Sequence, residues 1–210
     1  MRSEYVSKEV LEVIMRRMSP ENALAVRLSL TTGLRIGDCL KVRINDLADG
    51  NLFYIAEKTL KPGVAHIGAE LENELRLNSR GSVFCFPGKY GDKPRTRQTV
   101  YADIKKRAKE LKIDENVTPH TARKVFAVEE LKNKSFDEVQ KELQHSDPGI
   151  TMLYACSDRL GGLQPTSTQN NKKVQKTALL TPKLCEICPF SVGLEEIVDI
   201  VVARVLRALG

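Results

Sequence analysis

The sequence has no tryptophan, and aromatic residues make up only 5% of its 210 positions. Because single-stranded nucleic acids are usually held by bases stacked on aromatic side chains, this scarcity argues against a stacking platform of that kind. The chain also lacks any apolar run close to the roughly 20 residues of a membrane-spanning helix, so no membrane partner is expected. Its first residues carry no apolar segment followed by small residues, as a secretory signal would.

Cysteine is sparse as well: the five cysteines do not form the dense framework of a small secreted scaffold. We therefore expect a reducing, cytoplasmic setting. Cys185 and Cys188 form a CxxC pair, but zinc needs four ligands and no second pair lies nearby in the sequence. No metal and no cofactor is predicted.

The chain does have an excess of positive charge, with 33 Lys and Arg against 27 Asp and Glu and a net charge of +6. Charge of this sign permits nucleic-acid binding without establishing it. The excess is not confined to a basic tail, because residues 159–210 contribute only half of it. The basic residues therefore belong to the folded body as much as to its end.

Hydrophobic periodicity and turn signals predict an α+β fold, mostly helical with one small antiparallel sheet in the first half. Beyond Asp49 and Gly50, residues 51–58 and 64–69 are expected to form a β-hairpin with its tip near Lys61 to Gly63. A capping box at residues 135–138 predicts a helix over residues 139–144. Five further helices are expected, at 20–32, 36–42, 70–77, 99–113 and 120–133.

The chain is predicted to divide into a main domain (1–160), a flexible linker (161–175) and a helical tail (176–210). Four apolar residues of the tail recur at helical spacing and form one stripe: Ile197, Val201, Val205 and Leu209. This stripe is too apolar to stay in water, so it packs on its own domain or on a neighbouring copy of the chain.

Arg35 follows a Gly turn at the predicted start of a helix, where backbone N–H groups and a guanidinium favour an anion such as phosphate. The alternative is a surface ion pair with Asp38. His120 and Arg123 are three residues apart and share one helix face. An imidazole that moves protons and a guanidinium that holds oxygens suit a phosphodiester. The alternative is a histidine satisfied by backbone beside a solvated Arg123.

His145 and Tyr154 are separated by nine residues, and His145 follows a predicted helix. A phenol is a poor nucleophile at its usual pKa of about 10, but nearby cations and a positioned base activate it. The alternative for Tyr154 is a core tyrosine whose hydroxyl is hydrogen-bonded.

These residues lie in the stretches TTGLRIGDCLKVRINDL, IAEKT, HTARKVFA and ELQHSDPGITMLY, which span residues 31–154, most of the main domain. In this order and spacing, the four stretches resemble the tyrosine recombinase (phage integrase) family. The resemblance implies that residues 1–160 form a catalytic domain. It also implies an activity that cuts and rejoins DNA through a covalent 3′-phosphotyrosine, with no metal and no ATP.

Carried over residue by residue, Tyr154 matches the nucleophile, and Arg35 and Arg123 match the pair that holds the scissile phosphate. His120 matches the position assigned to proton transfer with the tyrosine. His145 matches a second phosphate-contacting position.

Lys58 matches the lysine that protonates the departing 5′ oxygen, with Lys61 as a competing candidate. The chain departs from the family pattern at Leu60, where the hairpin usually has glycine, and at Gln144, where glycine usually precedes the histidine. The family often has a histidine soon after the tyrosine, and here Ala155-Cys156-Ser157 follow. These differences affect the hairpin geometry and the packing around His145, and they remove no catalytic group.

Only about thirty residues precede TTGLRIGD, too few for the separate DNA-binding domain that family members usually carry there. We expect an isolated or minimal catalytic domain whose DNA binding is weak and salt-sensitive. Arg95 and Arg97, just before a predicted helix, are expected to contact the DNA backbone.

The sequence thus predicts a site-specific DNA recombinase, an integrase of a mobile element. Its expected partners are double-stranded DNA, further copies of itself in a dimer or tetramer on DNA, and an accessory DNA-binding protein. Two alternatives keep the same fold: a type IB topoisomerase-like enzyme that nicks and reseals one duplex, and a non-cutting DNA-binding module. A helix-turn-helix regulator explains the charge but leaves the tyrosine, histidines and arginines unexplained.

Overall fold

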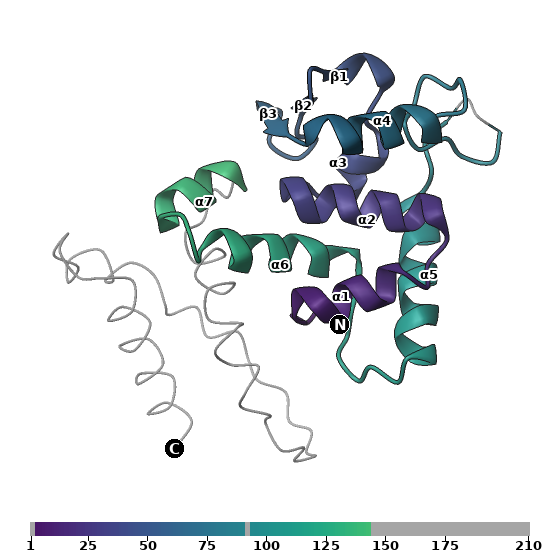
Figure 1. Ribbon diagram of the computed structural model, residues 1–210, viewed down its shortest axis with the longest axis vertical. Coiled ribbons are helices and arrows are strands. Elements are labelled where there is room, and N and C mark those ends of the chain that lie inside the picture. Colours follow the sequence, from purple (N-terminus) through teal and green to yellow (C-terminus); the bar gives the residue numbers. More distant parts are fainter. Residues whose placement is uncertain (1–2, 91–92, 144–210) are drawn as a thin grey trace, which may run out of the picture. The chain divides into compact units, whose positions relative to one another are not determined.

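The computed structural model describes residues 3–90 and 93–143 (Figure 1). All of them belong to the first of two compact units, Met1–Gly162. His145 and Tyr154, the linker and the helical tail lie outside the described residues. The predicted domain boundaries therefore stay predictions.

The described elements confirm the predicted fold class, with helices throughout and one three-stranded antiparallel sheet. In chain order they are α1 (Lys8–Met15), α2 (Pro20–Thr32), α3 (Ile36–Leu40), the 3-10 turn η1 (Ile44–Asp46), β1 (Leu47–Ala48), β2 (Asn51–Ile55), β3 (Pro62–His66), α4 (Gly68–Asn78), α5 (Arg97–Glu110), α6 (Pro119–Glu130) and α7 (Phe136–Glu142). Within the described part of the chain, no helix has the length and apolarity that crossing a membrane requires.

Helix α2 lies at the centre of these elements. Figure 1 shows α1 and α6 along one side of it, and α3, α4 and the sheet on the other. Ala25, Val26 and Leu28 on this helix are fully buried. The helix begins at Pro20, which suits a first turn, and ends at Gly33 in a left-handed conformation (φ 67°). A Cβ on Gly33 would also lie 2.5 Å from the Phe126 ring, so only glycine fits this turn.

The other predicted helices form close to where the sequence places them. Val100, Ile104 and Ala108 of α5 are buried, as their spacing predicts. Ser135 and Glu138 make the expected capping box of α7. Helix α1 was not predicted, although Ser7 caps it and its buried residues Leu11 and Ile14 share one face.

The predicted hairpin forms, but its tip was placed too late in the sequence. Ile55 pairs with Pro62, so the loop between β2 and β3 consists of residues 56–61. Pro62 is tolerated because it opens an edge strand. Gly63 is no turn residue either: a Cβ there would lie 2.5 Å from the Tyr54 ring. Lys58, predicted on a strand, lies in the loop instead.

Candidate active site

One pocket of about 750 Å³ is lined by four of the predicted site residues, which come from three separate parts of the chain. Arg35 precedes α3, Lys58 lies in the β2–β3 loop, and His120 and Arg123 lie on α6. Three further cations line the same pocket: Lys41, Arg95 and Arg97. The acidic lining residues are Asp38 and Glu57. Six Lys and Arg against two carboxylates give the pocket a strongly positive charge.

Arg35 is positioned by a tightly hydrogen-bonded turn. The Ser29 hydroxyl donates to the Leu34 carbonyl at 2.6 Å, and the Leu34 N–H donates to the Thr32 hydroxyl at 3.3 Å. Together with the left-handed Gly33, these bonds fix the backbone that leads into Arg35. Serine and threonine side chains often satisfy turn backbone in this way.

The alternative interpretation of Arg35, an ion pair with Asp38, is not found. Oδ1 of Asp38 accepts a hydrogen bond from the Glu57 backbone N–H at 3.2 Å. Among the described residues, no hydrogen bond or ion pair involves the Arg35 guanidinium. Since α3 has only five residues, its helix dipole is small, and the guanidinium supplies most of the attraction for an anion.

Arg123 is buried, with 2% of its surface exposed, so the alternative of a solvated arginine is wrong. Its Nη1 donates to the Gly33 carbonyl at 2.6 Å, and its Nη2 donates to the Leu143 carbonyl. Both acceptors lie at the C-terminal ends of helices, where carbonyl groups lack a partner within the helix. Two of the five N–H donors of the guanidinium thus tie α6 to the ends of α2 and α7.

His120 is an exposed residue in the first turn of α6, and it lines the pocket. Its backbone N–H donates to the Thr118 hydroxyl at 3.2 Å, so the helix end is capped by threonine. Desolvation, followed by the positive charges of Arg123, Lys124 and Arg35, lowers the pKa of His120 to about 4. The imidazole is therefore neutral at pH 7.

The β2–β3 loop closes on itself and directs Lys58 to the pocket. The Ala56 N–H donates to the Lys61 carbonyl at 3.0 Å, and the Leu60 N–H donates to the Ala56 carbonyl at 2.8 Å. Leu60 takes a positive φ (54°), which residues other than glycine rarely adopt. Among the described residues that line the pocket, Lys58 is present and Lys61 is absent.

Comparison with known proteins identifies the family of the chain. Residues 4–159 match the model of the phage integrase family. The chain belongs to the phage integrase family. It is 27% identical over 154 residues to the tyrosine recombinase XerD of Halalkalibacterium halodurans, which covers 65% of this chain and 49% of that protein.

Solved structures of other family members share the fold. A lambda integrase dimer bound to a COC′ core site matches with a TM-score of 0.62 and 18% identity, over 83% of this chain and 52% of that chain. The catalytic domain of bacteriophage HP1 integrase matches with a TM-score of 0.54 and 17% identity, over 79% of this chain and 97% of that chain. The present chain thus spans about half the length of the XerD and lambda proteins.

Family membership directs attention to the tyrosines. The chain has five, and four of them are described: Tyr5, Tyr54, Tyr90 and Tyr101. None of these four lines the basic pocket. The two described cysteines offer no substitute nucleophile, because burial raises the pKa of the Cys85 thiol to about 12 and that of Cys39 further still. The predicted roles of Tyr154 and His145 fall outside the described residues.

Sequence reasoning missed one cation of the pocket. Lys41 follows the last turn of α3, and its Nζ lies 2.6 Å from Oε1 of Glu57 in the β2–β3 loop. A lysine in a solvent-exposed position gives no signal in a single sequence. Lys41 does follow Asp38 by three residues, and that spacing could have suggested that the two side chains are neighbours.

Proposed function

We propose that this chain is the catalytic part of a site-specific DNA recombinase that cleaves and rejoins DNA through a covalent 3′-phosphotyrosine. The observation that carries the proposal is the positive pocket, in which Arg35, Arg123 and a neutral His120 occur together in a member of the phage integrase family. Guanidinium groups suit the planar, bidentate recognition of phosphate oxygens. The proposed reaction uses neither a metal nor ATP.

In the proposed cleavage step, the phenol oxygen of Tyr154 attacks the scissile phosphorus. A new bond forms between that oxygen and phosphorus, and the bond from phosphorus to the 5′ oxygen breaks. Arg35 and Arg123 neutralise the charge that develops on the non-bridging oxygens. The covalent intermediate stores the bond energy, so the reverse attack by a 5′ hydroxyl reseals the strand.

Two side chains handle the protons of this step. His120 accepts the proton of the phenol, and Lys58 donates a proton to the departing 5′ oxygen. A neutral imidazole is the form that accepts a proton, and the pKa of about 4 keeps His120 in that form without DNA. A bound phosphate places negative charge beside the imidazole, which raises its pKa and makes it a stronger base.

The family resemblance supplies the two roles that lie outside the described residues: Tyr154 as the nucleophile and His145 as a second phosphate contact. Since the four described tyrosines do not line the pocket, Tyr154 is the tyrosine we assign to the reaction.

The proposed partners are duplex DNA and further copies of the chain. Solved structures of relatives include a lambda integrase tetramer bound to a Holliday junction and XerH bound to its difH substrate. We infer an equivalent DNA-associated dimer or tetramer here, with an accessory DNA-binding protein as a further expected partner.

A nicked suicide duplex tests the proposal, because loss of a short fragment after cleavage traps the covalent intermediate. The wild-type chain should yield a protein–DNA adduct on a denaturing gel. Tyr154→Phe should yield none, and Tyr101→Phe should match the wild type. An adduct that survives Tyr154→Phe would refute the assigned nucleophile.

Two further outcomes of this experiment overturn the proposal in different ways. DNA binding by the wild type without any adduct would identify a non-cutting module. Adduct formation together with relaxation of a supercoiled plasmid that lacks a second site would identify a topoisomerase-like enzyme.

A further inference from the structure

Two hydrogen bonds of Glu57 join the β2–β3 loop to α3 and to Lys41, which directly follows that helix. The backbone N–H of Glu57 donates to Oδ1 of Asp38 at 3.2 Å. The Glu57 carboxylate accepts from Nζ of Lys41 at 2.6 Å. Lys58, the next residue along the chain, lines the basic pocket.

The helix that anchors the loop is also the helix that Arg35 precedes. Arg35 is the N-cap of α3, Asp38 lies in its first turn and Lys41 is its C-cap, so one short element carries the phosphate-binding residue and both anchoring residues. The loop itself is a closed unit, because Ala56 is bonded to Lys61 and Leu60 to Ala56. A displacement of Glu57 therefore carries Lys58 with it.

From these contacts we propose that Lys41 and Glu57 form a latch that holds the β2–β3 loop against α3 and so keeps the Lys58 ammonium at the pocket. Lys41 and Glu57 are positioning residues here, and they act through Lys58. The inference rests on the proposed function, because it assumes that Lys58 protonates the 5′ oxygen. A lysine side chain has a long flexible stem, so a fixed backbone position is what confines its ammonium group.

The size of the effect follows from the exposure of the pair. The side chains of Lys41 and Glu57 are 53% and 64% exposed, so the ion pair is weak. The Lys41 hydrogen bond and charge lower the pKa of the Glu57 carboxyl, so the pair is ionised at neutral pH. Loss of one weak exposed pair corresponds to a change of about two- to five-fold in the population of the latched loop.

The test measures single-turnover cleavage at saturating DNA with two duplexes, one with a normal 5′ oxygen and one with a 5′ sulfur at the scissile bond. A sulfur leaving group departs without a proton, so its cleavage does not need Lys58. Lys41→Met and Glu57→Gln should each slow cleavage of the oxygen duplex about two- to five-fold and leave the sulfur duplex unchanged. The double variant should be no slower than either single variant, because both remove the same ion pair.

The two substitutions have opposite effects on DNA affinity, which separates positioning from binding. Lys41→Met removes a positive charge from the pocket and should weaken binding, whereas Glu57→Gln removes a negative charge and should strengthen it. Equal slowing of the oxygen duplex by both variants therefore points to the latch. Lys132→Met is the matched control: it breaks the exposed Lys132–Glu129 pair outside this pocket and should change neither cleavage rate.

Equal rates for all variants, or equal slowing of both duplexes, would overturn the latch. A second readout does not depend on cleavage. Amide hydrogen exchange of residues 56–60 in the DNA-free chain should be about two- to five-fold faster in both latch variants than in the wild type. If the wild type forms no adduct, the proposed function fails, and unchanged exchange would separately refute the latch.

Discussion

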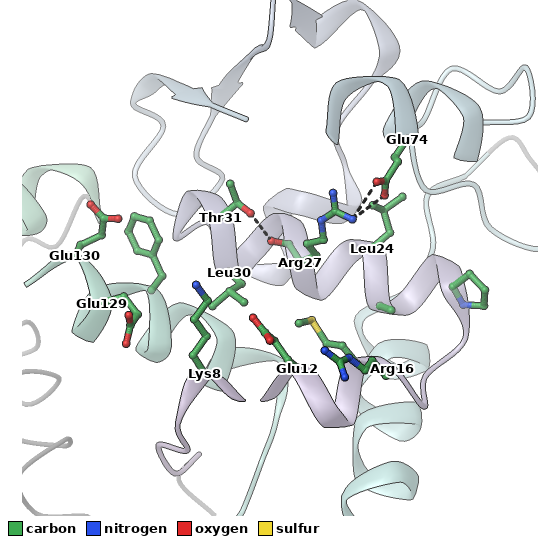
Figure 2. Close-up of a pocket in the computed structure, with 14 residues that line it drawn as sticks. Lys8, Glu12, Arg16, Leu24, Arg27, Leu30, Thr31, Glu74, Glu129 and Glu130 are labelled. Atoms are coloured by element: carbon green, nitrogen blue, oxygen red, sulfur yellow. Dashed lines mark hydrogen bonds and ion pairs between the residues drawn. The ribbon is translucent and has the colours of Figure 1, made fainter. Parts of the chain in front are cut away.

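Two pockets of nearly equal size lie on the described part of the chain, and they differ in charge. The basic pocket has a volume of about 750 Å³ and the second pocket, formed mainly by α1, α2 and α6, about 720 Å³. Figure 2 shows that the second pocket mixes acidic and basic side chains around apolar ones. Its lining contains three basic residues, Lys8, Arg16 and Arg27. It also contains four acidic residues: Glu12, Glu74, Glu129 and Glu130.

The charges of the second pocket nearly balance and four of its charged residues are ion-paired, whereas positive charge is in excess in the basic pocket. Nη1 of Arg27 lies 3.0 Å from both carboxylate oxygens of Glu74 (Figure 2). Glu129 and Glu130 are paired with lysines 132 and 134. A cavity of suitable size is therefore not enough to identify a phosphodiester site, and the unbalanced positive charge is the distinguishing property.

Because α6 contributes to both pockets, a basic-pocket substitution can be matched by a control substitution in the second pocket. The same helix that bears His120 and Arg123 also bears Glu129 and Glu130, one to three turns later. Such a control variant has the same core and fold as the basic-pocket variant. A difference in cleavage between the two variants therefore reports on the pocket that was changed.

The largest expected effect is that of Arg123→Ala. It leaves two buried carbonyls, those of Gly33 and Leu143, without their charged donor, which should cost about 2–4 kcal/mol of unfolding free energy. Cleavage of the suicide duplex should fall below detection. Arg27→Ala, which breaks a half-exposed pair, should cost at most about 1 kcal/mol and leave cleavage intact. Denaturant unfolding and the adduct assay measure both, and equal losses for the two variants would remove the contrast between the pockets.

Arg35→Gln should separate catalysis from stability. Since no hydrogen bond or ion pair of the Arg35 guanidinium exists among the described residues, its loss should change the unfolding free energy by less than about 0.5 kcal/mol. Removal of one group that stabilises the transition state typically slows the reaction about 10²- to 10³-fold. Single-turnover cleavage by Arg35→Gln should fall by that factor, while the exposed second-pocket variant Arg16→Gln should cleave at the wild-type rate. Normal cleavage by Arg35→Gln would show that the phosphate binds elsewhere.

The salt dependence of DNA binding counts the ion pairs that each pocket makes with DNA phosphates. A plot of log K against log[salt] becomes shallower by about one unit for each such ion pair that a substitution removes. Arg97→Gln should reduce the slope by about one, and Lys8→Gln should leave it unchanged. Fluorescence anisotropy of a labelled duplex with the Tyr154→Phe chain gives the slope. A shallower slope with Lys8→Gln alone would place the duplex on the opposite pocket.

The smallest expected effect is a pH dependence of stability. The folded chain holds His120 at a pKa of about 4, against 6.5 for an ordinary histidine, so between these values the unfolded chain binds the additional proton. The contribution of His120 to stability is therefore complete above pH 6.5 and is lost as the pH falls towards 4. His120→Gln should flatten this part of the curve of unfolding free energy against pH. An unchanged curve would mean that the cations do not act on the imidazole as described.

Much of the fold was predictable because helix ends carry local signals. The capping box at Ser135, the Ser19-Pro20 start and the Gly33 end each act through neighbouring backbone, so the sequence window contains the cause. The buried stripe of α5 follows from helical periodicity in the same way. The family motifs linked segments that are far apart in the sequence. The basic pocket brings together four residues from those segments.

The remaining features depend on interactions between distant residues. Lys-Pro-Gly at 61–63 is typical of a turn, yet Gly63 is required by the Tyr54 ring on the neighbouring strand, and the turn uses Leu60 instead. The burial of Arg123 depends on carbonyls 90 and 20 residues away. Neither cause is visible in a local window, which explains why the hairpin tip and the solvated alternative for Arg123 were wrong.

The most direct test of the central claim is a crystal structure of the Tyr154→Phe chain bound to an uncleaved duplex. Our account predicts the scissile phosphate within hydrogen-bonding distance, about 3 Å, of the Arg35 and Arg123 guanidiniums, with the Lys58 ammonium beside the 5′ oxygen. A duplex that lies across the α1, α2 and α6 pocket, with its phosphates far from Arg35, would contradict it.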